Sequence, residues 1–128
     1  MRISSNFDDF KKLRAALARI DKFKVHSALH SALNSTATQL IPIIKSFTPV
    51  KTGLLKSSWN FEILDGLSSA TLVIYNKTFY SRFVEFGHFS RSGTWVRGFF
   101  MLTKGTQNAE EILKKELKRE IEKIIRVY

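Results

Sequence analysis

The feature that most constrains the fold is a change in hydrophobic periodicity around residues 48–59. Before this stretch the apolar residues recur at helical spacing, and after it they alternate as they do in a strand. Pro49 lacks a backbone N–H and disfavours helical geometry at Thr48, so a helix that arrives here is predicted to end. Gly53 can adopt a positive φ and turn the chain. The stretch is therefore predicted to be a corner that connects a helix to a strand.

Two helices are predicted before this corner. The first spans residues 6–20 with Asn6 as its N-cap, and the second begins after a capping Asp21. Pro42 lies inside the second helix and predicts a kink or break near Leu40, because proline removes a helical hydrogen bond. The apolar stripe of this helix suits either the core or a second subunit. Its members recur three or four residues apart: Val25, Leu29, Leu33, Thr36, Leu40, Ile44 and Phe47, with Ala28, Ala32 and Ala37 beside them.

A β-hairpin is predicted after the corner. Its first strand is indicated by an alternation over residues 55–63, in which every second side chain is mostly apolar and those between are polar or charged. Asp65-Gly66 is a turn signal after this strand. Residues 70–75 form the return strand, so the two strands are expected to pair in an antiparallel sheet. The alternating side chains of the first strand are Leu55, Ser57, Trp59, Phe61 and Ile63.

The rest of the chain is predicted to end in a long amphipathic helix. Residues 79–86 form a short helix or an extended segment, with Gly87 just past a helix end, and residues 88–97 form a loop. Residues 99–102 are an edge strand or lead into the last helix, which Thr106 or Asn108 caps. The apolar face of that helix comprises Ile112, Leu113, Leu117, Ile121, Ile124 and Ile125.

This order of elements predicts an α+β fold in a single domain over residues 1–128. The expected architecture has N-terminal helices, a small antiparallel sheet built on a β-hairpin, and a long C-terminal amphipathic helix.

The charge balance indicates a basic surface. The chain has 21 lysines and arginines against 11 acidic residues, a formal net charge of +10, and no acidic residue between Asp21 and Glu62. Such a surface attracts polyanions, so a small nucleic-acid-binding module is an alternative function. The chain has no cysteine, which excludes disulfides and thiolate metal sites, and no segment is predicted to span a membrane.

The sequence contains no pattern that predicts catalysis, a cofactor or a metal site. His26 and His30 have the spacing of helical zinc ligands, but such sites need a third ligand and usually an adjacent glutamate, and position 27 is serine. Residues 51–53 match the Lys-Thr-Gly box of serine β-lactamases. That chemistry also requires a serine three residues before a lysine, which the chain lacks. The protein is therefore predicted not to be an enzyme.

Aromatic residues gather between residues 79 and 100. Six of the eleven phenylalanines lie there, together with Tyr80 and Trp95. A small domain cannot easily bury all of them, and aromatic residues are enriched at protein–protein interfaces. Stacking on nucleic-acid bases is a second interpretation, with Arg82, Arg91 and Arg97 interleaved. A locally aromatic core is the third.

Three motifs follow one another along the chain. Residues 49–58 read Pro-x-x-Thr-Gly-x-Leu-x-x-Ser, residues 80–87 read Tyr-x-x-x-Val-Glu-Phe-Gly, and residues 98–101 form an aromatic segment led by glycine. Together they resemble the bacteriophage minor tail-component family, the tail-completion or head–tail joining neck proteins of long-tailed phages and prophages. The signature and interaction residues expected from these segments are Pro49, Lys51, Thr52, Gly53, Ser58, Trp59, Tyr80, Glu85, Phe86, Gly87, Trp95, Arg97, Phe99 and Met101.

The resemblance implies a structural virion protein of the head–tail junction with no enzymatic activity. It implies a ring, expected to be a hexamer, whose partners are the head connector and the tail terminator or tail-tube proteins. The ring would surround the DNA channel and touch phage DNA non-specifically. The protein would reside in the virion, and in the host cytoplasm during assembly. Glu85 is expected to pair either with a basic residue of a neighbouring subunit or within its own chain.

Overall fold

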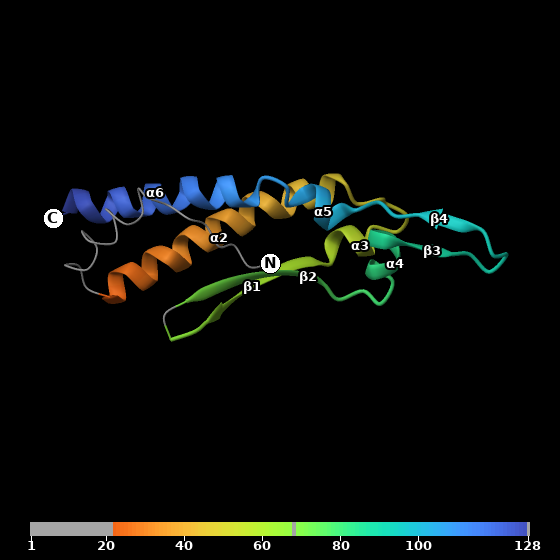
Figure 1. Cartoon of the computed structure of the whole chain (residues 1–128), viewed down its shortest axis with the longest axis horizontal. Helices are drawn as coiled ribbons and strands as arrows, with labels where there is room; N and C mark the ends of the chain where they lie inside the picture. Colours follow the sequence, from red (N-terminus) through yellow and green to blue (C-terminus); the bar gives the residue numbers. More distant parts are fainter. Residues whose placement is uncertain (1–21, 68, 128) are drawn as a thin grey trace.

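The computed structural model describes residues 22–67 and 69–127, so the predicted helix over residues 6–20 and the cap at Asp21 lie outside the described residues. Figure 1 shows an elongated molecule, with two long helices at one end and a small hairpin projecting at the other. The α+β class is confirmed. The elements in chain order are α2 (Lys22–Ser46), α3 (Leu54–Ser57), β1 (Trp59–Asp65), β2 (Ala70–Asn76), α4 (Ser81–Phe86), β3 (Gly87–Phe89), β4 (Trp95–Arg97), α5 (Met101–Gly105) and α6 (Ala109–Val127).

Helix α2 lies at the centre of the core, with other elements packed against two of its sides. Helix α6 lies along one side and the β1–β2 hairpin along the other (Figure 1). Ala32 and Ala37 are fully buried, and their small side chains let Leu72 of β2 and Leu113 of α6 pack in one cluster with them. The buried part of the predicted apolar stripe therefore faces the core of its own chain.

The sequence predicted a kink or a break near Leu40. Helix α2 continues through Pro42 to Ser46, so the helix does not break there. Pro42 and Thr38 are both exposed, which leaves water free to bond the Thr38 carbonyl that loses its helical donor. Leu40 and Ile44 flank the proline and are fully buried. Burying two such side chains contributes about 1.5–3 kcal/mol each, which offsets the roughly 3 kcal/mol cost of an interior proline.

The first strand begins later than the alternation predicted. Residues 54–57 form the single-turn helix α3, and β1 starts at Trp59. The hydroxyls of Ser57 and Ser58 donate to the Leu54 carbonyl oxygen, at 3.1 and 2.6 Å. Such local side-chain hydrogen bonds compete with the ladder of a sheet, and here they hold a helical turn in place of the first residues of the strand.

The β1–β2 hairpin and the short helix after it are confirmed. Strands β1 and β2 pair antiparallel, with Trp59 opposite Asn76 and Asp65 opposite Ala70. Helix α4 occupies residues 81–86, and Gly87 caps its C-terminal end with φ 89°.

Residues 88–97 do not form the predicted loop. They contribute most of a second hairpin, in which Gly87 of β3 pairs with Arg97 of β4 and Phe89 pairs with Trp95. The turn between these strands is closed by the Ser90 N–H, which donates to the Thr94 carbonyl oxygen at 2.8 Å. Strands of three residues are too short to show a period of two, so hydrophobic alternation could not reveal them.

The C-terminal part of the chain contains two helices, α5 and α6, with a turn at residues 106–108 between them. Residues 99–100 lead into α5, and α6 begins directly after Asn108 with Glu110 and Glu111 in its first turn, where carboxylates favour the helix dipole. Leu113 and Ile121 lie on the buried face of α6. None of the helices in the described ranges is long and apolar enough to cross a membrane.

Candidate partner-binding site

One hydroxyl group, that of Thr48, connects the two ends of the corner at residues 48–59. Trp59 is buried, and its indole N–H donates to Thr48 Oγ1 at 2.9 Å. The same hydroxyl donates to the Ile44 carbonyl oxygen at 2.8 Å. The Thr48 side chain therefore joins the last turn of α2 to the first residue of β1. Trp59, one of the expected signature and interaction residues, is a core side chain in this structure.

The first motif turns the chain as its sequence predicted. Gly53 has φ 82° and ψ −8°, a left-handed conformation, at the start of α3. The Thr52 hydroxyl oxygen accepts a hydrogen bond from the Leu54 N–H at 3.4 Å. Lys51 and Thr52 are exposed, whereas Pro49 and Ser58 are half-buried.

The second and third motifs form one interlocked unit. The Phe99 and Phe100 N–H groups donate to the Val84 and Glu85 carbonyl oxygens, at 2.8 and 3.0 Å. A Cβ atom added to Gly98 would lie only 2.5 Å from the Glu85 carbonyl oxygen, so the backbones touch where glycine stands. The separate motifs of the sequence are therefore adjacent backbone segments in space.

Glu85 caps the start of helix α5. Glu85 as a whole residue is 7% exposed, and its carboxylate accepts hydrogen bonds from the N–H groups of Leu102 and Thr103, at 2.8 and 3.2 Å, and from the Thr103 hydroxyl at 2.9 Å. A carboxylate at a helix N-terminus satisfies donors that have no partner within the helix. The sequence left open whether Glu85 pairs with a neighbouring subunit or within its own chain. In this structure its hydrogen-bond partners, Leu102 and Thr103, belong to its own chain.

The three motifs together line one pocket, which we call the signature pocket, of about 410 Å³. Its wall is mostly apolar, with Lys51 and Arg97 as exposed cations. His88 also lines it, and the Nδ1 atom of His88 is buried without a hydrogen-bond partner among the described residues. The lining residues are Pro49, Lys51, Thr52, Gly53 and Leu55 from the corner, Tyr80, Phe83, Val84 and His88 from the middle, and Val96, Arg97 and Phe99 from the third segment.

An aromatic arm, residues 86–100, contains β3 and β4, and its hairpin projects at one end of the molecule (Figure 1). Part of the arm lines the signature pocket. Phe89 and Trp95 pair edge to face near its turn, with ring centroids 5.0 Å apart. All five of its large aromatic side chains are at least 40% exposed, so the arm is not the aromatic core considered from the sequence. These side chains are Phe86, Phe89, Trp95, Phe99 and Phe100.

The residues expected from the sequence thus divide into three groups by their exposure to solvent. Trp59, Glu85 and Met101 are buried, and their contacts are structural. The exposed group, which a partner could reach, comprises Lys51, Thr52, Phe86, Trp95, Arg97 and Phe99. Pro49, Gly53, Ser58, Tyr80 and Gly87 are half-buried. Sequence reasoning missed Phe89 and His88 as site residues, because only the pairing of β3 with β4 places them beside Trp95 and the pocket.

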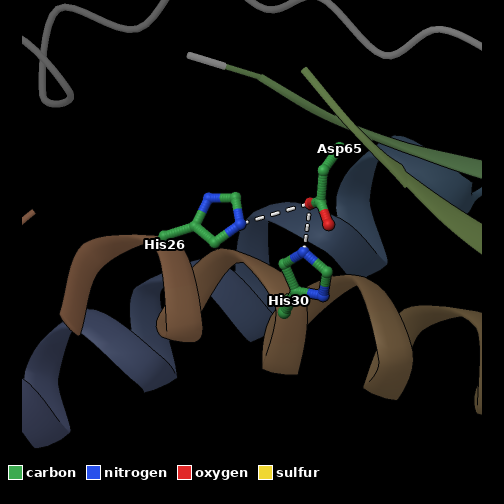
Figure 2. Close-up of polar contacts among 3 residues, drawn as sticks. All are labelled: His26, His30 and Asp65. Atoms are coloured by element: carbon green, nitrogen blue, oxygen red, sulfur yellow. Dashed lines mark hydrogen bonds and ion pairs between the residues drawn. The ribbon is translucent and has the colours of Figure 1, made fainter. Parts of the chain in front are cut away.

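A second polar cluster lies away from the signature pocket, between α2 and the tip of the β1–β2 hairpin (Figure 2). His26 and His30 stand one helical turn apart, and both present Nε2 to the same oxygen of Asp65. The His26 Nε2 to Asp65 Oδ1 distance is 3.2 Å, and His30 is hydrogen-bonded to that oxygen directly. The hydrogen bond with His30 lowers the pKa of the Asp65 carboxyl below its ordinary value, and the charges of both histidines act in the same direction.

Comparisons with known proteins identify the family through the region of the first two motifs. Neither the curated proteins nor the solved structures contain a significant match to the chain. One family model, described as "Bacteriophage HK97-gp10, putative tail-component", matches residues 11–87, more than half of the chain. That range ends at Gly87, the last residue of the second motif. The chain therefore belongs to the HK97-gp10-like family of bacteriophage tail components.

Proposed function

We propose that this tail component acts at the head–tail junction, as a neck or tail-completion protein that assembles into a ring around the DNA channel. The observation that carries the proposal is the aromatic arm. It carries five exposed aromatic side chains, of which Phe89 and Trp95 lie on the β3–β4 hairpin that projects from the body of its own chain (Figure 1). The head connector and the tail terminator or tail-tube proteins are the partners above and below such a ring.

The arm is large enough to carry a subunit interface. Buried aromatic side chains contribute about 150–250 Å² each, and those of the arm are on average roughly half exposed. Five of them therefore offer about 500 Å² of aromatic surface. A standard interface takes about 800 Å² from each partner, and aromatic residues are enriched among the side chains that dominate its energy. We therefore infer that the aromatic side chains of the arm are buried against a second protein surface in the assembled particle.

The signature pocket supplies the complementary surface for a second copy of the chain. A ring needs a head-to-tail contact, in which one patch of a subunit meets a different patch of the next. The tip of the arm, with Phe89 and Trp95, and the signature pocket are two such patches, because neither of these side chains belongs to the pocket wall. We assign Phe89 and Trp95 of one subunit to the signature pocket of its neighbour, in a ring of six.

Charge supports the position around DNA. The chain carries a net charge of +10, and the exposed cations Lys51, Arg82, Arg91 and Arg97 lie on or near the arm and the signature pocket. A ring with this surface would hold the phosphate backbone by sequence-independent attraction that weakens with salt.

Ring formation is tested with a double variant of the arm. The full-length parent and Phe89→Ser/Trp95→Ser are compared by native mass spectrometry, alone and mixed with the connector and tail terminator of the same phage. Leu67→Ser is the matched control, because Leu67 is an exposed apolar residue at the tip of the other hairpin. Rings are expected from the parent and the control and not from the double variant. Rings from all three, with circular dichroism unchanged, would refute the role of the arm.

The position in the virion is tested by deleting the gene from the phage or prophage that encodes it. A neck or tail-completion protein predicts that filled heads and complete tails accumulate separately in electron micrographs and join when the gene is restored. Intact virions without the protein would refute the junction role. Absence of tails would place the protein earlier in tail assembly and refute it as well.

A further inference from the structure

The cluster of His26, His30 and Asp65 has the composition of a metal site. The two histidines lie four residues apart on α2, so their side chains share one face of the helix. Asp65 is the last residue of β1 and arrives from a different element. The sequence near His26 and His30 offers no third ligand, and this argued against a metal site. Asp65 supplies that third ligand from a distant part of the chain. This cluster is separate from the aromatic arm and the signature pocket, so metal binding here does not depend on the proposed function.

We propose that His26, His30 and Asp65 bind one transition-metal dication of the Zn²⁺ class, which clamps the tip of the β1–β2 hairpin onto helix α2. The ligand set is two imidazole Nε2 atoms and one carboxylate oxygen, with water completing a tetrahedron. Zinc sites with three protein ligands and one water are a common arrangement.

The distances suit such a site. With metal–ligand bonds of about 2.0–2.1 Å, two ligands of a tetrahedron are about 3.3–3.4 Å apart. The His26 Nε2 to Asp65 Oδ1 distance is 3.2 Å, and the three candidate ligand atoms all lie within 4.8 Å of one another. A metal ion would replace the hydrogen bond between His30 and Asp65, and small side-chain rotations would bring the three atoms around it. Figure 2 shows both rings already turned toward the carboxylate.

The chemistry of the ligands selects the class of metal. Imidazole suits Zn²⁺, Ni²⁺ and Cu²⁺, whereas Mg²⁺ and Ca²⁺ prefer sets of oxygen ligands. The net charge of +10 repels weakly held cations, so an ion must gain its affinity from the nitrogen ligands. The three side chains are 34–50% exposed, which gives an ion and its coordinated water access from solvent.

A simpler account assigns the cluster to hydrogen bonds alone. Two histidines that share a carboxylate already hold the hairpin tip against α2 without a metal. The two accounts differ in what happens when zinc is added. Hydrogen bonds alone predict no stoichiometric zinc binding, whereas the metal site predicts one ion per chain that all three side chains hold.

Zinc binding is measured by isothermal titration calorimetry on the full chain, purified without a histidine tag and treated with a chelator. His30→Ala and Asp65→Asn each remove one ligand. Glu62→Gln is the matched control, because it removes a carboxylate from an exposed position of the same strand, on the opposite face from Asp65. Parent and control are expected to bind one Zn²⁺, and each ligand variant is expected to bind it at least about tenfold more weakly.

Two further measurements report the geometry and the clamp. Visible absorption of bound Co²⁺ should show tetrahedral coordination in the parent and lose it in Asp65→Asn. Zinc should raise the unfolding midpoint of the parent and the control, and raise that of His30→Ala by less at the same zinc concentration, because the stabilisation follows the affinity of the folded site. Absence of stoichiometric binding by the parent overturns the proposal. Binding of equal strength by Asp65→Asn also overturns it, because the ion would then rest on a histidine pair alone.

Discussion

Replacing Gly87 with alanine tests whether backbone contact between the second and third motifs supports the arm. Gly87 has φ 89° and ψ 170°, a conformation that is almost confined to glycine. A Cβ atom at this position would lie 2.6 Å from the Val96 carbonyl oxygen and 2.9 Å from the Gly98 nitrogen. Both are backbone atoms that no side-chain rotation can move away. The β3–β4 pair must therefore shift to admit one methyl group.

The cost has two parts that can be estimated separately. Holding a non-glycine residue in this backbone conformation costs about 1–3 kcal/mol, and overpacking costs about another 1–3 kcal/mol. We therefore expect Gly87→Ala to lower the free energy of unfolding by about 4 kcal/mol. For a chain of this length such a loss lowers the midpoint of thermal unfolding by more than about 10 °C.

Gly53→Ala separates the two parts. Gly53 also has a positive φ, 82°, but a Cβ atom there would meet nothing within 4 Å. Only the backbone strain remains, so we expect a loss of about 1–2 kcal/mol. Urea unfolding of the parent and both variants measures the difference. If Gly87→Ala is no less stable than Gly53→Ala, the motifs do not depend on close backbone contact, and if Gly53→Ala matches the parent, the corner does not need a positive φ.

Three further substitutions and one binding measurement test other features of the structure. Lys51→Ala should leave the free energy of unfolding within about 0.5 kcal/mol of the parent, because its side chain is exposed; a larger loss in urea unfolding would show an unseen structural role. Glu85→Ala removes three hydrogen bonds at the start of α5 and should cost about 3 kcal/mol. It should also speed amide hydrogen exchange at Leu102 and Thr103, and unchanged exchange would contradict the cap. Trp59→Phe removes a buried hydrogen bond and should cost about 1–3 kcal/mol in the same urea assay, whereas stability equal to the parent would show that the corner hydroxyl finds another partner. The free chain should bind duplex DNA weakly, with log affinity falling linearly with log salt, and submicromolar affinity near physiological salt would favour the nucleic-acid-binding module instead.

The long elements could be predicted because each repeats one pattern over many residues. The stripe of α2 and the apolar face of α6 recur at helical spacing, and β1 alternates from Trp59 to Ile63. The turn at Asp65-Gly66 and the end of α4 at Gly87 carried local chemical signals of their own. In these places the preference of the backbone and the burial of the side chains point to the same structure.

The short elements could not be predicted in this way. Helix α3 and strands β3 and β4 are too brief to show a period, and contacts from elsewhere in the chain hold the arm. The hydrogen bond between the Phe99 N–H and the Val84 carbonyl oxygen joins two segments that the sequence presents as separate motifs. Pro42 is a different case, because its local sequence signal is strong but the helix does not break there. The burial of Leu40 and Ile44 on either side of it offsets the local cost of the proline.

By itself, the sequence determined the class of fold, the corner at Gly53 and the motifs that mark the family. Only the tertiary structure decided which motif residues are buried supports, as Glu85 is, and which, such as Trp95, remain exposed for a partner. It also brought Asp65 to His26 and His30, 35 residues beyond the nearer histidine. The physical reason is that neighbouring residues set the local preferences of the backbone, whereas burial and ligand geometry depend on packing between segments far apart in the chain.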